Sequence, residues 1–193
     1  GYNCSPMTES EFNALGQQGF NRVPLVAQAF ADLETPLSLY LTLVPATGQT
    51  SAFSFLLESV VGGERFGRYS FIGLPARTHL RASGFGDAAL TEVVTDGVVV
   101  ETSRQNPLDF VAQYHQRFKV ASQAGLPRFC GGLAGYFGYD TVRHIEKKLV
   151  HSCPPDTLGC PDILLVQCEE LGVIDNLSGM LYLMVYADPA QPG

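Results

Sequence analysis

The segments that decide the expected fold are Phe53-Ser54-Phe55-Leu56-Leu57-Glu58-Ser59 and Arg68-Tyr69-Ser70-Phe71-Ile72-Gly73. Apolar residues alternate along the first segment and recur at Tyr69 and Phe71 in the second, which is typical of strands in a sheet. Glycines in the residues between the two segments favour a loop there. We therefore predict two strands joined by residues 60–67, with polar side chains gathered where one strand ends and the next begins.

Three polar side chains would meet at this loop. Glu58 offers a carboxylate that accepts hydrogen bonds from an ammonium group, whereas Ser59 and Arg68 donate hydrogen bonds to a carboxylate. Such a set suits the binding of an amino acid. Two alternatives stay open at this point: a solvated loop without a ligand, and a structural ion pair between Arg68 and Glu58.

The size and charge of the chain limit its functions. The chain has 193 residues, 46% of them hydrophobic, which is enough for one ordinary domain with one core. Its formal net charge is -7, so a phosphate backbone would be repelled and nucleic acid is not an expected partner. No apolar run reaches the ~20 residues of a membrane-spanning helix, and we expect a cytoplasmic protein with no membrane partner.

Neither the cysteines nor the first six residues point to a function. Five cysteines in a chain without a secretory signal are expected to be reduced thiols. His151, Cys153 and Cys160 lie close together but contain no C-x-x-C pair, so a zinc site is disfavoured. Met7 followed by Thr8 resembles a natural start, and residues 1–6 are therefore expected to be left from expression.

Helices are marked by their first residues. Thr8 and Glu11 form a capping-box pattern ahead of a helix over Glu9–Gln17. Asn106 and Pro107 supply the N-cap and the first helical residue of another helix. Its apolar stripe is expected to face a sheet and consists of Leu108, Val111, Tyr114, His115 and Phe118. A short helix is also expected over Tyr139–Lys147.

Strands are expected to form most of the remaining chain. They are predicted at Val23–Ala31, Leu37–Val44, several places between Ser51 and Ser103, Gly131–Phe137, Ile163–Ile174 and Met180–Ala187. Asp96-Gly97 between apolar runs is typical of a hairpin turn, and Asn176-Leu177-Ser178-Gly179 joins the last two strands. The strands between residues 51 and 103 should form an antiparallel sheet. We therefore predict an α+β fold with largely antiparallel sheets and a few helices packed on one face.

The sequence predicts no catalytic residue in this chain. Glu169 and Glu170 are adjacent acids, but neighbouring residues of a strand point to opposite faces, so only one of them could face a pocket. Motifs of nucleophilic or zinc-dependent hydrolases are absent from the sequence. The glycines of residues 131–138 lack the spacing of a phosphate-binding loop and indicate a close approach of backbones instead.

Several motifs occur here in a fixed order, and together they resemble a known family. They are Leu56-Leu57-Glu58-Ser59, Gly67-Arg68-Tyr69-Ser70-Phe71-Ile72-Gly73, the glycine-rich Gly131-Gly132-Leu133-Ala134-Gly135-Tyr136-Phe137-Gly138-Tyr139-Asp140, and Asp175-Asn176-Leu177-Ser178-Gly179. The chain from about Phe20 to about Asp188 is similar to the amino-terminal domain of anthranilate synthase component I, a chorismate-utilising enzyme of tryptophan biosynthesis.

The resemblance implies how the chain is organised. Residues 7–193 would form a single amino-terminal regulatory domain, with a chorismate-binding catalytic domain after residue 193, and would be half of a larger α/β/β/α sandwich. The parent enzyme would be a lyase that converts chorismate and ammonia or glutamine to anthranilate and pyruvate. Its Mg²⁺ would be bound outside this chain. Its partners would be its own carboxy-terminal domain and a glutamine amidotransferase subunit, component II.

The resemblance also implies a feedback-inhibition site for L-tryptophan. In the family, the Leu-Leu-Glu-Ser segment and the basic residue of the next strand form half of this allosteric site. In this sequence those positions are Glu58, Ser59 and Arg68, and their neighbours are Phe66, Gly67 and Tyr69. Either aromatic side chain would offer a ring on which the indole could pack. The other half of the pocket would come from the catalytic domain.

Two other functions are compatible with the resemblance. One is the corresponding domain of aminodeoxychorismate synthase component I, the enzyme of the folate branch, in which tryptophan is a buried structural ligand. The other is a non-catalytic module that docks a glutamine amidotransferase. The glutamate before Ser59 and the full Gly-Arg-Tyr-Ser-Phe-Ile-Gly string favour the anthranilate branch.

Overall fold

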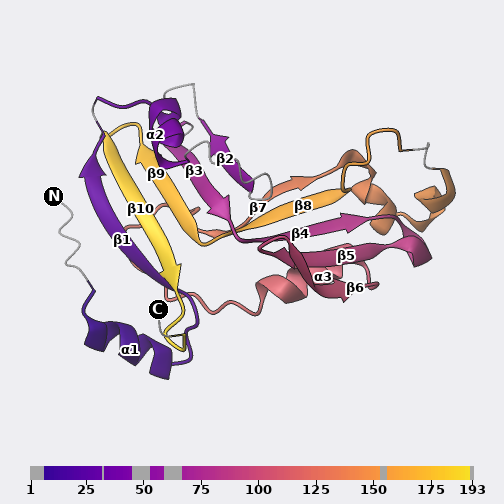
Figure 1. Cartoon of the computed structure of the whole chain (residues 1–193), viewed down its shortest axis with the longest axis horizontal. Helices are drawn as coiled ribbons and strands as arrows, with labels where there is room; N and C mark the ends of the chain where they lie inside the picture. The colour runs from indigo at the N-terminus through magenta and orange to yellow at the C-terminus, as the bar shows by residue number, and fades with distance from the viewer. Residues whose placement is uncertain (1–6, 32, 45–52, 59–66, 153–155, 192–193) are drawn as a thin grey trace.

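The chain folds into two antiparallel sheets joined end to end, as the computed structural model in Figure 1 shows. The structure describes residues 7–31, 33–44, 53–58, 67–152 and 156–191. Within these residues each sheet has five strands, and the helices are few and short. The predicted α+β class, with largely antiparallel sheets and few helices, is therefore confirmed.

Each sheet has its own strand order. The order in the first sheet is β1 (Val23–Phe30), β10 (Met180–Ala187), β9 (Glu170–Asp175), β3 (Tyr69–Ala76) and β2 (Phe53–Leu57). The order in the second sheet is β6 (Val98–Ser103), β5 (Leu90–Thr95), β4 (Thr78–Ser83), β8 (Ile163–Cys168) and β7 (Gly132–Phe137). The helices are α1 (Glu9–Gln17), α2 (Pro36–Leu43) and α3 (Pro107–His115), with 3₁₀ turns η1 (Gly86–Ala88), η2 (Tyr139–His144) and η3 (Lys147–Ser152).

A bent two-stranded ribbon joins the two sheets. β3 continues into β4 through Arg77, and β8 continues into β9 through Glu169. These strands stay paired on both sides of the bend, β3 with β9 and β4 with β8. The predictions of one sheet for residues 51–103 and of one strand over Ile163–Ile174 are therefore wrong. Buried residues lie on both sides of Arg77 and on both sides of Glu169 and Glu170, so periodicity alone does not reveal where a strand changes sheet.

The capping box predicted at the start of α1 is confirmed. In α1 the backbone N–H of Glu11 donates to Thr8 Oγ1 at 3.3 Å, and the Glu11 carboxylate accepts from the N–H of Thr8 at 2.8 Å. The predicted helix over Tyr139–Lys147 is instead the two 3₁₀ turns η2 and η3. The hairpin turn at Asp96 and Gly97 is also confirmed, with φ of 51° and 81° at the two residues.

The predicted strand Leu37–Val44 is wrong, because this segment forms helix α2. Thr35 and Ser38 form a capping box, in which each side-chain oxygen accepts from the other residue's backbone N–H at 3.0 and 2.9 Å. Pro36 occupies the first helical turn, where its missing N–H costs nothing. Leu39 packs on the first sheet against Ile72, Ile174 and Leu181.

Helix α3 covers one face of the second sheet. Phe110 and Tyr114 are buried and pack in one cluster with Leu80, Val93, Ile163 and Leu165. Leu108, Val111 and Phe118 are partly buried against this cluster, as predicted. The placement of His115 on the buried stripe is wrong, since this side chain is exposed. The stripe passes through Phe110 instead, which also has helical spacing from Tyr114.

Candidate functional site

The predicted amino-acid site lies at the end of the first sheet where β2 stops and β3 begins. Leu57, the last residue of β2, pairs with Phe71 of β3, so Glu58 directly follows the paired region. Tyr69 of β3 pairs with Asp175 of β9, which places the turn between β9 and β10 at the same end. Glu58, Arg68 and this turn are therefore brought to one edge of the sheet.

The guanidinium of Arg68 binds the carboxylate of Asp175 through two hydrogen bonds. Arg68 Nε donates to Oδ1 at 3.1 Å, and Nη2 donates to Oδ2 at 2.7 Å. The side chain of Asp175 is 2% exposed, whereas that of Arg68 is 41% exposed. The pair therefore joins a buried carboxylate to a guanidinium that reaches the surface.

The carboxylate of Asp175 is held in its charged form. Burial alone would raise the pKa of Asp175, but hydrogen bonds from Arg68, Ser178 and the backbone N–H of Leu177 outweigh burial and lower it. The hydrogen bond to Asp175 raises the pKa of Arg68 above its ordinary value. Asp175 also fixes the turn, because the N–H of Leu177 donates to its Oδ1 at 3.1 Å.

Asn176 ties the same turn to the start of β3. Its backbone N–H donates to the carbonyl of Arg68 at 2.8 Å. Its side-chain Nδ2 donates to the carbonyl of Gly67 at 3.3 Å and to Ser70 Oγ at 3.1 Å. Gly67 has φ of 88°, a conformation in which glycine is favoured over other residues. The turn at residues 175–179 thus holds the segment Gly67–Ser70 in place.

Of the remaining predicted site residues, the structure describes some and not others. Tyr69 lies beside Arg68, with the guanidinium carbon 5.0 Å from the ring centroid. Glu58 is exposed. The alternative ion pair between Arg68 and Glu58 does not form among the described residues, because Arg68 pairs with Asp175. Ser59 and Phe66 lie outside the described residues, so their part in the site stays a prediction.

Sequence reasoning missed Asp175 and Asn176 as members of this site. Both belong to the Asp-Asn-Leu-Ser-Gly motif. From the sequence this motif predicted only a hairpin turn and supported the resemblance to the family. The available signal was a buried-strand pattern ending in an acid, since a carboxylate at the end of an apolar strand needs a charged or hydrogen-bonding partner. The basic residue with which it could pair was already known, but nothing in the sequence showed that β9 lies next to β3.

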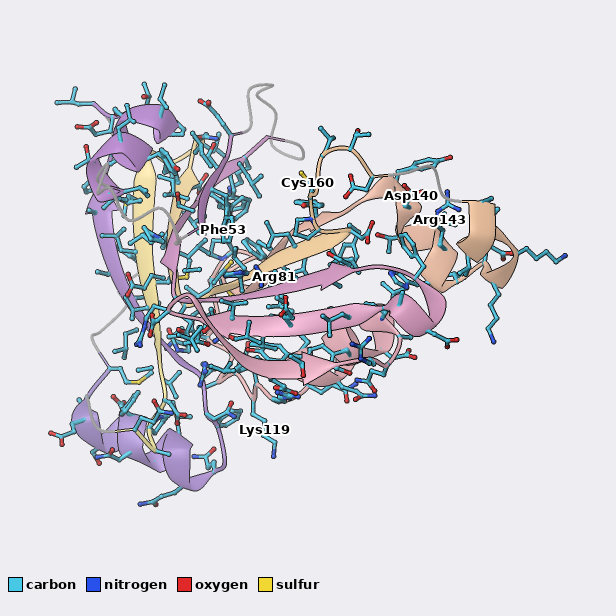
Figure 2. All side chains as sticks on the ribbon, turned by 45° about the vertical axis from the view of Figure 1, so that its right-hand side comes forward. Phe53, Arg81, Lys119, Asp140, Arg143 and Cys160 are labelled. Atoms are coloured by element: carbon cyan, nitrogen blue, oxygen red, sulfur yellow. The ribbon has the colours of Figure 1, made fainter. Side chains whose placement is uncertain are left out.

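Other ion pairs serve the structure of the second sheet (Figure 2). At its far end Arg143 Nε donates to Asp140 Oδ1 at 2.8 Å, and its Nη1 donates to the carbonyl of Leu149. Arg81 of β4 donates to Glu92 of β5 at 2.7 Å. No group of three or more His, Cys, Asp or Glu side chains is placed to hold a metal ion in the part of the chain that the structure describes. None of its described helices is long and apolar enough to span a bilayer.

Several proteins of known name are similar to this chain over nearly its whole length. Anthranilate synthase component 1 of Neisseria meningitidis is 51% identical over 189 residues, which cover 96% of this chain and 37% of the relative. The Pseudomonas putida protein of the same name is 48% identical over 186 residues, with coverage of 96% and 36%. That of a Synechocystis species is 35% identical over 179 residues, with coverage of 93% and 33%.

The other two comparisons add less. A crystal structure of anthranilate synthase component I from Streptococcus pneumoniae aligns with 86% of this chain and 32% of its own, at 22% identity and a TM-score of 0.49. No family model matches the chain. The chain spans between 33% and 37% of the length of the curated relatives described above. The similarity over 96% of the chain nevertheless confirms the resemblance read from the sequence, and the chain belongs to the anthranilate synthase component 1 family.

Proposed function

We propose that this chain is the regulatory part of an anthranilate synthase component I and contributes half of a feedback site for L-tryptophan. The parent enzyme would act in the cytoplasm and convert chorismate and ammonia to anthranilate and pyruvate. Its Mg²⁺ would lie outside this chain, and a glutamine amidotransferase subunit would supply the ammonia. The observation that supports the enzyme is the 51% identity to a protein of that name over 96% of the chain.

The geometry at the end of the first sheet supports an amino-acid effector. The exposed carboxylate of Glu58 suits the ammonium group, and the ring of Tyr69 suits the indole. Arg68 could either bind the ligand's carboxylate or hold the loop, and its bidentate bond to Asp175 favours the second role. Ser59 would then hold the polar end of the ligand.

The names of the curated relatives favour the tryptophan branch over the folate branch, since those described above are all called anthranilate synthase component 1. Their greater length also favours a part of an enzyme over a free-standing docking module. In an aminodeoxychorismate synthase, tryptophan would remain bound without inhibiting the reaction. Inhibition is therefore the property that distinguishes the two enzymes.

The test is anthranilate formation by the intact protein, followed by fluorescence, with chorismate, ammonia and Mg²⁺ at increasing L-tryptophan. We expect inhibition that is relieved by a substitution in the loop after Glu58. Direct binding to this chain alone can be followed in parallel, because it contains no tryptophan and the indole of the ligand is the reporter. Anthranilate formation that tryptophan does not affect would contradict the regulatory role and leave the enzyme assignment standing.

A further inference from the structure

A cavity of about 140 Å³ lies where the two sheets meet, apart from the proposed tryptophan site. It is lined by residues from the start of β1, the end of α3, the start of β7 and the end of β8, among them Arg22, Phe118, Gly132 and Glu169. Glu169 precedes β9, whereas Asp175 ends it, so the two places are separated by the length of a six-residue strand, about 20 Å. The cavity is therefore independent of the proposed effector site.

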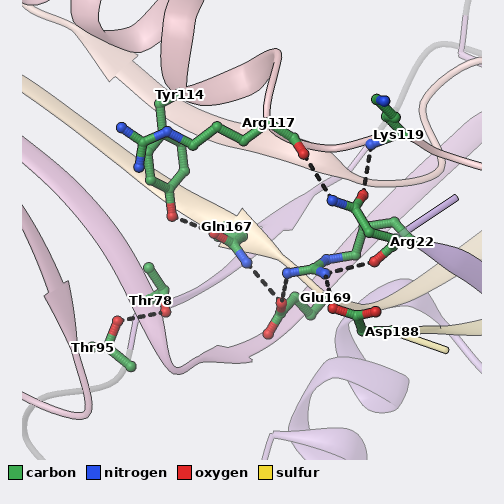
Figure 3. A network of polar contacts seen from close by, with 10 residues as sticks. Arg22, Thr78, Thr95, Tyr114, Arg117, Lys119, Gln167, Glu169 and Asp188 are labelled. Carbon is green, nitrogen blue, oxygen red and sulfur yellow. Dashed lines mark hydrogen bonds and ion pairs between the residues drawn. The ribbon is translucent and has the colours of Figure 1, made fainter. Parts of the chain in front are cut away.

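A hydrogen-bonded chain forms the polar end of this cavity (Figure 3). The hydroxyl of Tyr114 donates to Gln167 Oε1 at 2.7 Å, and Gln167 Nε2 donates to Glu169 Oε1 at 2.7 Å. Arg22 Nη2 donates to the same oxygen of Glu169 at 3.2 Å. Both donors thus use Oε1. The other oxygen of Glu169, Oε2, has no hydrogen-bond partner among the described residues.

The ion pairs at this end carry an excess of negative charge. Arg22 contacts two carboxylates, those of Glu169 at 3.2 Å and Asp188 at 3.5 Å. The guanidinium also lies over the ring of Phe118, 4.8 Å from its centroid, which fixes its position. Asp188 does not line the cavity, but it shares the guanidinium of Arg22 with Glu169. The carboxylate of Glu169 is therefore only partly neutralised and favours a cationic ligand over an anionic one.

The rest of the wall is mainly apolar and includes two glycines. Gly131 and Gly132 have φ of 148° and 107°. A Cβ on Gly131 would come within 2.5 Å of the ring of Tyr186, so the backbone here passes directly against that ring. A Cβ on Gly132 would point toward the imidazole of His115, at 3.9 Å from Nε2. These glycines belong to the motif whose spacing disfavours phosphate binding, and neither adds a side chain to the wall.

We propose that this cavity binds a small amine of the benzylamine type, in which an aromatic ring carries a protonated aminoalkyl group. An apolar cavity of about 150 Å³ is large enough for benzene, so the observed volume fits a single six-membered ring. The ring would lie between Phe118 and Tyr186, and its ammonium group would donate to the unused oxygen of Glu169. The site does not depend on the proposed enzymatic function.

The proposal is tested with three probes of one shape: benzylamine, benzyl alcohol and benzoate. Isothermal titration calorimetry on the intact protein at pH 7 should show benzylamine binding most tightly and benzoate most weakly. Glu169→Gln should weaken benzylamine by about tenfold and change benzyl alcohol by less than about twofold, because only the charged donor loses its counter-charge. Benzylamine and benzoate of equal affinity, or no binding of benzylamine at millimolar concentration, would overturn the proposal.

Two further variants keep the test informative. Glu101→Gln is the matched control, because Glu101 is a carboxylate in another arginine ion pair, is 37% exposed against 35% for Glu169, and does not line the cavity. It should leave benzylamine binding unchanged. His115→Trp should abolish the binding of all three probes by filling the mouth of the cavity, and His115 is exposed, so the fold should tolerate the change. Binding that survives His115→Trp would place the amine elsewhere.

Discussion

Arg68 and Asp175 are 107 residues apart in sequence, yet they form a bidentate ion pair that joins the start of β3 to the end of β9. The pair is half-exposed on the arginine side and buried on the aspartate side. A similar bidentate pair, Arg77 with Asp96, lies at the hairpin of the second sheet, where both side chains are exposed. Comparing the two pairs therefore shows how much burial adds to the stabilisation by a bidentate ion pair.

Asp175→Ala should lower the free energy of unfolding by about 2 kcal/mol, because it removes a charge-assisted acceptor and leaves the N–H of Leu177 unpaired. Asp96→Ala should change it far less, since Asp96 is 54% exposed and its ion pair is surrounded by water. Urea denaturation of both variants and the wild type measures the difference. Equal losses in the two variants would show that burial adds nothing to the Arg68–Asp175 pair.

Acid should destabilise the protein partly through Asp175. The pKa of this carboxyl is lowered in the folded state from an ordinary value of 3.8. Its contribution to stability is therefore present above that value and is lost as the pH falls below it toward the folded pKa. Between pH 5 and pH 2 the wild type should lose more stability than Asp175→Asn, measured by urea denaturation at each pH. Parallel losses in the two proteins would assign the acid sensitivity to other carboxyls.

In the intact enzyme, Ser59→Phe should relieve inhibition by tryptophan and leave the uninhibited rate nearly unchanged. Bulk in the effector pocket penalises the inhibited state but not the catalytic domain. With a typical coupling, the inhibitory concentration would rise roughly 5- to 150-fold. Ser83→Phe, at an exposed position of the second sheet, is the control and should not alter inhibition. Unchanged inhibition in Ser59→Phe would place the effector site elsewhere.

Asp175→Asn should act on inhibition indirectly, by loosening the turn that holds Gly67–Ser70. We expect it to raise the inhibitory concentration of tryptophan while the affinity for chorismate stays the same. Asp96→Asn is the control at the exposed ion pair and should leave inhibition unchanged. An effect of the same size in both variants would point to a general loss of stability.

Gly135→Ala should destabilise the edge strand β7. A Cβ at this position would lie 2.0 Å from the carbonyl oxygen of Leu164, and φ is 158°. Gly97→Ala tests conformational strain alone, because φ is 81° and nothing lies within 4 Å. We expect losses of about 3 kcal/mol for Gly135→Ala and about 1 kcal/mol for Gly97→Ala in urea denaturation. The reverse order would show that β7 shifts freely away from β8.

Features set by neighbouring residues could be predicted from the sequence, and features set by distant ones could not. Thr8 with Glu11, Asp96 with Gly97, and Asn106 with Pro107 act within a few residues, and each predicted the structure that formed. Helix α2 was missed although Thr35 and Pro36 mark its start, because its apolar run resembles a strand.

In the candidate site, too, features set by nearby residues could be predicted and those set by distant residues could not. Its two flanking strands and the polar residues Glu58 and Arg68 follow from alternation and from the motifs. The partner of Arg68 does not, because the pairing of β3 with β9 brings together residues that are more than 100 positions apart. The change of sheet at Glu169 was hidden for a similar reason, since its partner Arg22 lies at the other end of the chain.

The bent ribbon also determines the order in which the two sheets can be completed. Every strand of the second sheet lies between residues 78 and 168, whereas the first sheet needs strands from both sides of that interval. The second sheet is thus an insertion whose two ends leave from neighbouring strands, near Ala76 and Glu170. During synthesis it can close before β9 and β10 have emerged, and its closure brings the two halves of the first sheet together.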